Sequence, residues 1–282
     1  MNNSEQDTHH SANQGAHNSA HAEATPGVTT SITAAAVPVQ LGQFWGIGVG
    51  PGPAGYLPLV ALSALQQADV IFAPRARSAD ASVALQCLQG IDIDVTRLRE
   101  IEFNMDPDRS VLQSHYAALA QTIADELRAG RSVAYLTIGD SLTYSTYGYI
   151  LAALCELLPT MPHRTFPGIT SYAAAAAALG WPLGEGKERT LILPCPETPA
   201  ALQQEIATHD IVVLMKIGHR LPWVLALLRE MGVAEHCGFA RRIGLAGELL
   251  STDVESLSAD AAIGYLATLL IRKTARERRH IP

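Results

Sequence analysis

Short apolar segments and longer amphipathic segments alternate along this chain from residue 43 onward. Runs of apolar and β-branched residues predict buried strands, and apolar positions three or four residues apart predict helices. The two kinds of segment alternate, which favours α/β layers in both halves of the chain. The predicted strands are 44–49, 70–73, 101–105, 133–138, 190–193, 211–215, one segment within 238–244, and 261–271. The predicted helices are 59–67, 82–88, 110–129, 147–158, 172–179 and 222–231.

The segment 133–146, VAYLTIGDSLTYST, carries the polar residues of greatest interest. A predicted strand ends at Gly139 and Asp140, and several hydroxyl side chains follow before the next predicted helix. Ligands of open α/β sheets bind outside the carboxyl ends of the strands, so this loop is a candidate ligand site. The same pattern also fits an ordinary strand-to-helix turn in which Asp140 caps the helix. The rest of the chain must decide between these interpretations.

A glycine-rich loop follows the first predicted strand. Its glycines at 50, 52 and 55 match the G-x-G-x-x-G pattern of dinucleotide-binding proteins. However, Pro51 removes a backbone donor from the loop that should hold the phosphates. Asp69, the nearest acid at a suitable spacing, precedes the next strand instead of ending it. Both features disfavour a nucleotide-binding oxidoreductase.

The length and composition predict how the chain is divided. Its 282 residues are sufficient for two domains, which we predict at 41–160 and 161–282, with Pro159 and Pro162 at the boundary. Residues 1–40 are rich in Ser, Asn, Ala, Thr and His and lack apolar periodicity, so we expect a disordered leader. The leader has no basic segment followed by an apolar one, so a secretory signal is not expected.

Charge, hydropathy and cysteine usage exclude several classes of function. No uninterrupted apolar run reaches the ~18 residues of a membrane span, so no membrane association is expected. The net charge of −7 argues against a nucleic-acid-binding surface. The four cysteines lie far apart with no CxxC pair, which predicts free thiols in a cytoplasmic protein. No metal-ligand spacing appears, so no metal site is predicted.

Several segments together resemble one known family, the tetrapyrrole methylases. They occur in the family's order and cover nearly all of the chain from residue 43 to residue 273. The GDxxxYST loop, the PGITS turn and VLMKIG are more diagnostic together than any one of them alone. Ser141 departs from the family, which commonly has proline after the GD pair. The matching segments are GIGVGPGPAGYLPLVALSAL, ADVIFAP, EIEFNMDPDRS, VAYLTIGDSLTYSTYGYI, FPGITSYAAAAAALGWPL, VVLMKIGH and YLATLLIRK.

The resemblance implies two α/β domains with S-adenosylmethionine bound in a cleft between them, and a homodimer. It also implies which residues contact the cofactor, through the positions that match the family's motifs. These residues are Pro51, Gly139, Asp140, Thr143, Tyr144, Ser145, Thr170, Ser171, Met215, Ile217 and Ala240.

The activity implied is methyl transfer to a bridging carbon of a reduced tetrapyrrole. The EIEF-M segment and the MKIG ending are similar to those of the family members that methylate C(20) of precorrin-2 or cobalt-factor II. A proton must leave the methylated carbon, and Asp140 is a candidate base. This substrate carries many carboxylates, so cationic groups after strand ends are candidate contacts. These are Lys216, His219, Arg75 and Arg77.

Other functions within and outside the family are compatible with parts of the pattern. A sibling enzyme acting on another tetrapyrrole carbon, on diphthamide or on ribosomal RNA would share the fold, and the acidic charge disfavours RNA. A cofactor-binding protein without activity would be expected to lose the polar loop GDSLTYST, which is intact here. The sequence does not distinguish metal-free precorrin-2 from cobalt-factor II.

Overall fold

The computed structural model describes residues 40–77, 79–103 and 109–276. All of them belong to one compact unit, residues 39–282. The predicted disordered leader, and the basic residues after 276, lie outside the described residues. Among the described residues, no helix combines the length and the apolar character that crossing a membrane requires.

The first half contains a five-stranded sheet in the order β3-β2-β4-β1-β5. Every neighbouring pair in this sheet is parallel, so the carboxyl ends of its strands lie along one edge. β4 and β1, the strands next to the two candidate loops, are neighbours. The strands are β1 Phe44–Gly48, β2 Val70–Ala76, β3 Leu98–Phe103, β4 Val133–Thr137 and β5 His163–Phe166.

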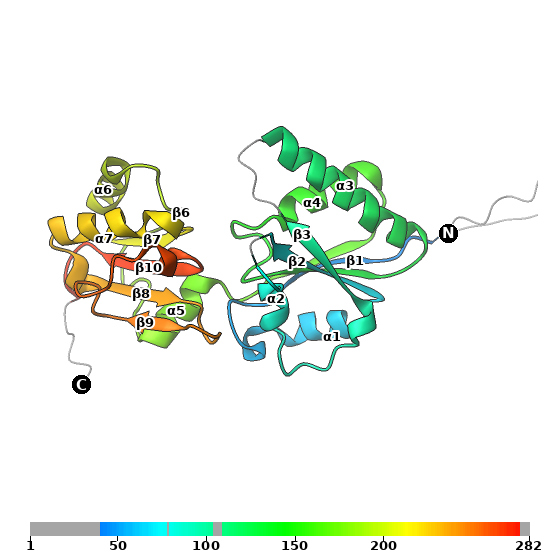
Figure 1. The fold of residues 1–282 in the computed structure, drawn as a ribbon, viewed down its shortest axis with the longest axis horizontal. Coiled ribbons are helices and arrows are strands. Elements are labelled where there is room, and N and C mark those ends of the chain that lie inside the picture. The colour runs from blue at the N-terminus through cyan, green and yellow to red at the C-terminus, as the bar shows by residue number, and fades with distance from the viewer. Residues whose placement is uncertain (1–39, 78, 104–108, 277–282) are drawn as a thin grey trace, which may run out of the picture. The chain divides into compact units, whose positions relative to one another are not determined.

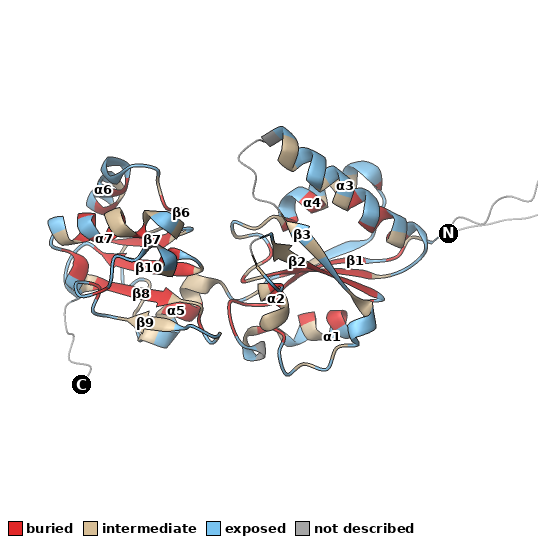
Figure 2. Cartoon of the chain, viewed as in Figure 1, coloured by how far each residue is buried: buried red, intermediate tan, exposed pale blue. Residues whose placement is uncertain are grey.

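Helices cover both faces of the first sheet (Figure 1). Alternate side chains of β4 point to opposite faces, with Ala134 and Leu136 packed towards α1 and α2, and Val133 and Tyr135 packed towards α3 and α4. Figure 2 shows the resulting buried residues along the central strands. The helices are α1 Leu59–Gln67, α2 Val83–Gln86, α3 Arg109–Arg128 and α4 Tyr147–Leu157.

The second half contains a mixed sheet in the order β6-β7-β10-β8-β9. β6 and β7 are parallel, whereas the other neighbouring pairs are antiparallel. The alanine-rich helix α5 packs on one face, and α6 and α7 pack on the other. The strands are β6 Thr190–Pro194, β7 Ile211–Met215, β8 Cys237–Arg241, β9 Leu249–Ser251 and β10 Ala267–Arg272. The helices are α5 Ser171–Leu179, α6 Pro199–Thr208 and α7 Leu221–Glu230.

The predicted α/β fold class is confirmed, with differences in single elements. The predicted strand 261–271 is wrong in its first part, because Ala261–Gly264 is a 3-10 turn in which the Asp260 side chain accepts from the N–H of Ala262. β5, α6 and β9 were not predicted. The domain boundary at residue 160 stays a prediction, and β5 pairs with β1 beyond it. The other 3-10 turns are Ala54–Tyr56, Val95–Arg97, Gly218–Arg220 and Ala234–His236.

Candidate functional site

Four glycines bring the carboxyl ends of β4, β1 and β5 into direct backbone contact. A Cβ atom on Gly48 would lie 2.5 Å from the backbone nitrogen of Gly168 and 2.8 Å from the carbonyl oxygen of Gly139. Gly50 and Gly139 form an isolated bridge, with N–H···O distances of 3.1 and 2.8 Å. Only glycine permits this approach, so the two candidate loops and the PGITS turn meet at one edge of the sheet.

Asp140 ties these loops together through four hydrogen bonds. Its Oδ1 accepts from the backbone N–H groups of Leu142 and Thr143, both at 3.0 Å, and from Thr143 Oγ1 at 2.9 Å. Its Oδ2 accepts from the N–H of Gly168 at 3.1 Å. Partial burial acts to raise the pKa of this carboxyl, but the hydrogen bonds outweigh it and lower the pKa. Asp140 is therefore ionised at neutral pH and holds the loop in shape.

The remaining hydroxyls of the loop also form internal contacts. The buried Ser141 donates its hydroxyl to the carbonyl oxygen of Phe166 at 2.8 Å, and Ser145 donates to the carbonyl oxygen of Ser141. Tyr144 has a φ of 51°, which is strained for a residue with a large side chain. Its hydroxyl donates to the carbonyl oxygen of Ile192 in β6 at 2.9 Å. The loop is thus fastened to strands of both sheets.

The residues of the second half that were predicted to contact the cofactor lie on or next to α5, β7 and β8. Thr170 caps α5, and Ser171 Oγ lies 3.0 Å from Thr268 Oγ1 on β10. Thr268 is in register with the buried Ala240 of β8, so these residues are neighbours. Met215 ends β7.

Two further predicted contacts have limited access. Ile217 is fully buried in the core beneath α7, so only its backbone is available to a ligand. Pro51 is also buried and lies beside Gly50 in the first loop.

Lys216 stands out among the predicted substrate contacts. It follows β7 with a φ of 53°, in the left-handed region that is unfavourable for a residue with a side chain. Much of its side chain is exposed, yet the surrounding protein desolvates the ammonium group and lowers its pKa. Lys216 has no ion-pair partner among the described residues. The neighbouring His219 is exposed.

Arg75 and Arg77 are neutralised by acids on the adjacent strand. Arg75 lies 3.4 Å from Glu100 and 3.6 Å from Glu102, and Arg77 lies 3.5 Å from Glu102. β2 and β3 are parallel neighbours, and their register puts Glu100 and Glu102 beside the two arginines. These ion pairs leave less positive charge for an anionic ligand, and the predicted contacts with a substrate stay untested.

Large hydrophobic side chains on these loops remain exposed and are available to a ligand. Leu142, Tyr144 and Ile169 are large hydrophobic residues that are exposed on the loops after β4 and β5. Thr137, the last residue of β4, has a buried hydroxyl with no hydrogen-bond partner among the described residues. Exposed apolar side chains on loops that also carry polar groups fit a ligand with both apolar and polar parts. The residues present therefore fit a cofactor of that kind.

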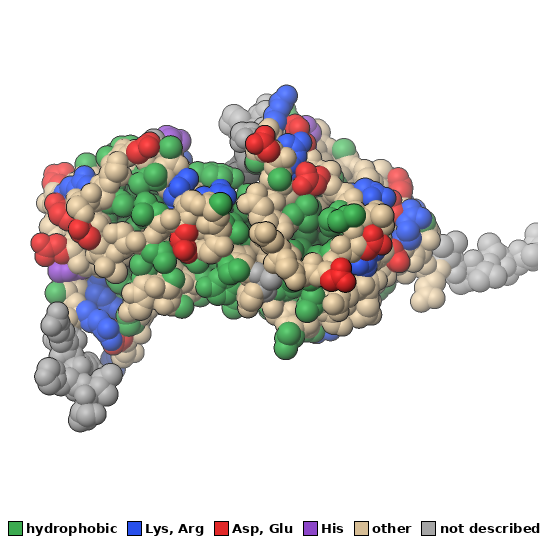
Figure 3. All heavy atoms as spheres, turned by 60° about the horizontal axis from the view of Figure 1, so that its bottom comes forward, with side chains coloured by type: hydrophobic (Ala, Val, Ile, Leu, Met, Phe, Trp, Pro, Cys, Tyr) green, Lys and Arg blue, Asp and Glu red, His purple; other side chains and the backbone are tan. Residues whose placement is uncertain are grey.

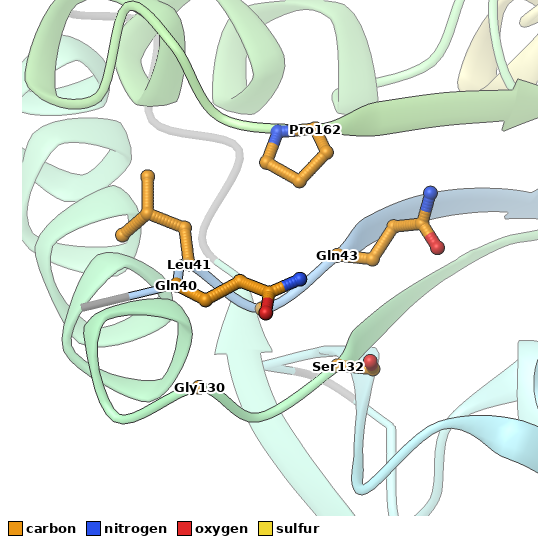
Figure 4. A pocket seen from close by; sticks show the side chains of 7 residues that line it. Gln40, Leu41, Gln43, Gly130, Ser132 and Pro162 are labelled. Carbon is orange, nitrogen blue, oxygen red and sulfur yellow. The ribbon is translucent and has the colours of Figure 1, made fainter. Parts of the chain in front are cut away.

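A separate pocket lies at the opposite edge of the first sheet (Figure 4). Its volume is about 570 Å³, and residues at the amino ends of β1, β4 and β5 line it. None of the predicted site residues lines this pocket. Ligands of parallel sheets bind at the carboxyl edge, so we assign the functional site to the loops described above. The lining residues are Gln40, Leu41, Gly42, Gln43, Gly130, Ser132 and Pro162.

The predicted site residues did not include three that shape the candidate site, although two of them stood in the GDxxxYST loop and the PGITS turn. Gly48 and Gly168 make the close backbone approach possible, and Ser141 fastens the loop to β5. Gly48 ends a run that is otherwise typical of a strand, which is a signal for close approach of another backbone. The hydroxyl of Ser141 supplies a hydrogen bond to β5 that the proline expected from the resemblance would lack.

Comparison of the sequence with known proteins gives consistent matches. The family model of the Tetrapyrrole (Corrin/Porphyrin) Methylases matches residues 43–257. A probable cobalt-precorrin-2 C(20)-methyltransferase of Methanocaldococcus jannaschii is 33% identical, over 83% of this chain and 97% of the relative. The cobalt-precorrin-2 C(20)-methyltransferase of Salmonella typhimurium is 28% identical, over 82% of this chain and 97% of the relative.

Solved structures show the same fold. A cobalt precorrin-4 methyltransferase matches with a TM-score of 0.59 and 19% identity, over 82% of this chain and 94% of that one. Uroporphyrin III C-methyltransferase of Thermus thermophilus, solved with S-adenosylhomocysteine, matches with a TM-score of 0.55 and 17% identity, over 82% and 92%. Because the family model spans most of the sequence, the chain belongs to the tetrapyrrole (corrin/porphyrin) methylase family.

Proposed function

We propose that this protein is an S-adenosylmethionine-dependent methyltransferase that methylates C(20) of precorrin-2 or cobalt-factor II in corrin synthesis. The observation that carries the proposal is the match to relatives named for this reaction over 96–97% of their own length. The precorrin-2 C(20)-methyltransferase of a Sinorhizobium species, 28% identical, is one of them. A site loop that is complete and fastened by Asp140 supports an active enzyme.

The cofactor, when bound, supplies a methyl group on a positively charged sulfur. Five of the predicted cofactor residues would hold it. They are Gly139 and Thr143 after β4, Thr170 and Ser171 at the start of α5, and Met215 at the end of β7. The protein's part is to orient these groups and to exclude water, because alignment of the reactants supplies most of the acceleration in a reaction of this kind. The exposed Leu142 and Ile169 supply apolar surface for that purpose.

Asp140 is proposed as a positioning residue. Four hydrogen bonds engage its carboxylate, and its lowered pKa makes it a weak proton acceptor at neutral pH. The role of Asp140 as catalytic base stays a prediction. A backbone carbonyl or water can accept the proton instead.

Lys216 is proposed as the main contact for a substrate carboxylate. It is a cation without an ion pair among the described residues, at the end of the strand that carries Met215. His219 follows in the next turn and is a second donor. Arg75 and Arg77 are proposed as weaker contacts, since Glu100 and Glu102 compete for their charge.

The assay is an anaerobic incubation of the purified full chain with methyl-labelled S-adenosylmethionine and either precorrin-2 or cobalt-factor II. Mass spectrometry reads the methyl gain, and NMR of the labelled product reads the carbon that received it. One methyl at C(20) is expected on one of the two substrates. A methyl on another carbon would assign the protein to a sibling reaction, and cofactor binding without transfer to either substrate would refute the C(20) assignment.

We also propose a cytoplasmic homodimer, as the resemblance to the family implies. Figure 3 shows a face of the described residues on which acidic, basic and hydrophobic side chains are interspersed, as on an ordinary protein surface in water. Light scattering of the purified chain reads its mass directly. A mass of one chain at assay concentration would contradict the dimer.

A further inference from the structure

Three aromatic rings form a continuous stack at the carboxyl edge of the first sheet. Phe103 ends β3, Tyr116 lies on α3, and Tyr149 lies in the first turn of α4. The ring centroids of Phe103 and Tyr116 are 5.7 Å apart, and those of Tyr116 and Tyr149 are 5.1 Å apart. The planes meet at 28° and 13°, so the rings are stacked nearly parallel. We call these three residues the aromatic stack.

The outer end of the aromatic stack faces solvent. Tyr149 is 62% exposed, whereas Phe103 and Tyr116 are half-buried. Leu142, on the loop that leads into α4, is 64% exposed. Both residues lie in the segment after β4, at the proposed ligand edge of the sheet, where exposed apolar side chains indicate a binding surface.

Packing of α3 on α4 uses only one side of the Tyr149 ring, which lies against Tyr116, and leaves the rest of the ring exposed. Fully buried aliphatic residues already hold these helices on the sheet, among them Ile123 and Leu127 of α3 and Ile150 and Leu154 of α4. The exposed ring of Tyr149 adds little to this core. Binding of a ligand explains an exposed aromatic ring at this position better than core packing does.

The aromatic stack is joined to the end of the site loop through Tyr149, whose backbone N–H donates to the carbonyl oxygen of Thr146 at 3.2 Å. The Tyr135 hydroxyl lies 3.4 Å from Thr146 Oγ1, at the end of the loop that Asp140 shapes. Tyr135 and Tyr147 also contact each other through their rings, with centroids 6.2 Å apart. Thr137, with its unsatisfied buried hydroxyl, follows Tyr135 on the same face of β4. A ligand lying on Tyr149 would therefore lie beside the end of the site loop.

We propose that the aromatic stack is a platform for the flat face of the tetrapyrrole macrocycle. The inference rests on the proposed function, because it takes its ligand class from there. Stacking suits the conjugated part of a reduced tetrapyrrole, and aromatic rings prefer offset, nearly parallel contacts. The platform holds the ring by its face, while Lys216 binds a carboxylate at the rim.

The test compares three variants of the full chain. Tyr149→Ser removes the exposed ring, and Tyr149→Phe keeps the ring without its hydroxyl. Leu157→Ser removes another exposed apolar side chain from the same helix, where Leu157 is 38% exposed. Tyr149→Ser is expected to raise the KM for the tetrapyrrole about two- to ten-fold. The KM for S-adenosylmethionine should stay unchanged, and Tyr149→Phe and Leu157→Ser should behave like the wild type.

A binding measurement separates this inference from the proposed function. Titration with uroporphyrin III, followed by its absorbance, uses a stable flat macrocycle and needs no turnover. If the wild type transfers no methyl group but Tyr149→Ser weakens this binding, the proposed function fails and the platform is supported. If the wild type is active and Tyr149→Ser changes neither KM nor binding, the platform is refuted. Dissociation of an oligomer by Tyr149→Ser would make the aromatic stack a subunit interface and also refute it.

Discussion

The carboxylate of Asp140 accepts a hydrogen bond from the backbone N–H of Gly168 at 3.1 Å, although the two residues are 28 positions apart in the sequence. Gly168 in turn leaves no room for a side chain, because a Cβ atom there would overlap the carbonyl oxygen of Gly139. The charge of Asp140 and close contacts among four glycines thus join the loops after β1, β4 and β5. The geometry of the proposed cofactor site depends on this joint.

Replacement of Asp140 should loosen the joint. Asp140→Asn keeps one acceptor oxygen but places an NH₂ group against one set of N–H donors, and Asp140→Ala removes every acceptor. We expect Asp140→Ala to lower the free energy of unfolding by about 1.5–3 kcal/mol and Asp140→Asn by less. Urea unfolding measures both. Equal stability of Asp140→Ala and wild type would show that the joint contributes nothing to folding.

The contribution of Asp140 should also depend on pH. Its pKa is lowered in the folded protein from an ordinary value of 3.8, so the folded state favours the ionised form. The stabilisation is therefore complete above the unfolded pKa and is lost as the pH falls through the folded pKa. The stability difference between wild type and Asp140→Asn should be constant above about pH 5 and shrink below about pH 4. A difference that grows on acidification would contradict this sign.

A methyl group at Gly168 should lower the free energy of unfolding, whereas one at Gly148 should not. Gly168→Ala pushes a Cβ atom into backbone that cannot move aside, and we expect a loss of about 1–3 kcal/mol together with weaker cofactor binding. Gly148 lies in α4 with no atom near its added Cβ, so Gly148→Ala should stabilise the helix by about 0.5–1 kcal/mol. Thermal unfolding and calorimetric titration with S-adenosylhomocysteine test the pair. Similar effects of the two substitutions would refute the steric argument.

Loss of the Lys216 charge should weaken substrate binding selectively. Lys216→Met is expected to raise the KM for the tetrapyrrole about five-fold, equivalent to about 1 kcal/mol, with the cofactor KM unchanged. Lys187→Met, at another exposed lysine, is the matched control.

The pKa of Lys216 is lowered from 10.5, so its cation is lost at a lower pH than that of an ordinary lysine. The KM of the wild type should therefore rise at alkaline pH, and that rise should be absent in Lys216→Met. A parallel rise in both proteins would exclude this lysine as its source.

Arg272 should stabilise the second sheet more than an exposed arginine nearby. It is only 5% exposed, pairs with Glu188, and lies 5.1 Å from the ring of Trp181. We expect Arg272→Met to lower the free energy of unfolding by about 3 kcal/mol. This is the low end for a broken buried ion pair, because Glu188 keeps some contact with water. Arg276→Met, which breaks a half-exposed pair with Glu185, should cost about 0–1 kcal/mol. Equal losses in urea unfolding would contradict the difference in burial.

The periodicity of the sequence predicted much of the first half correctly. The helix predicted at 59–67 has those bounds in the structure, and β4 differs from the prediction by one residue. β5 escaped prediction because HRTF has a mixed polar pattern, and it becomes a strand through its pairing with β1. α6 was missed although Thr198 caps it and Pro199 occupies its first turn. The short edge strand β9 has too few residues to show a period.

The sequence by itself determined most of the order of strands and helices, the polar loop after β4, and the family to which the chain belongs. Local patterns encode these properties, because burial repeats every two residues in a strand and every three to four in a helix. Only the tertiary structure decided that Gly168 would meet Asp140, that Glu100 would neutralise Arg75, and that Tyr149 would end an exposed aromatic stack. Those contacts depend on strand order and register, which join residues that no local pattern relates.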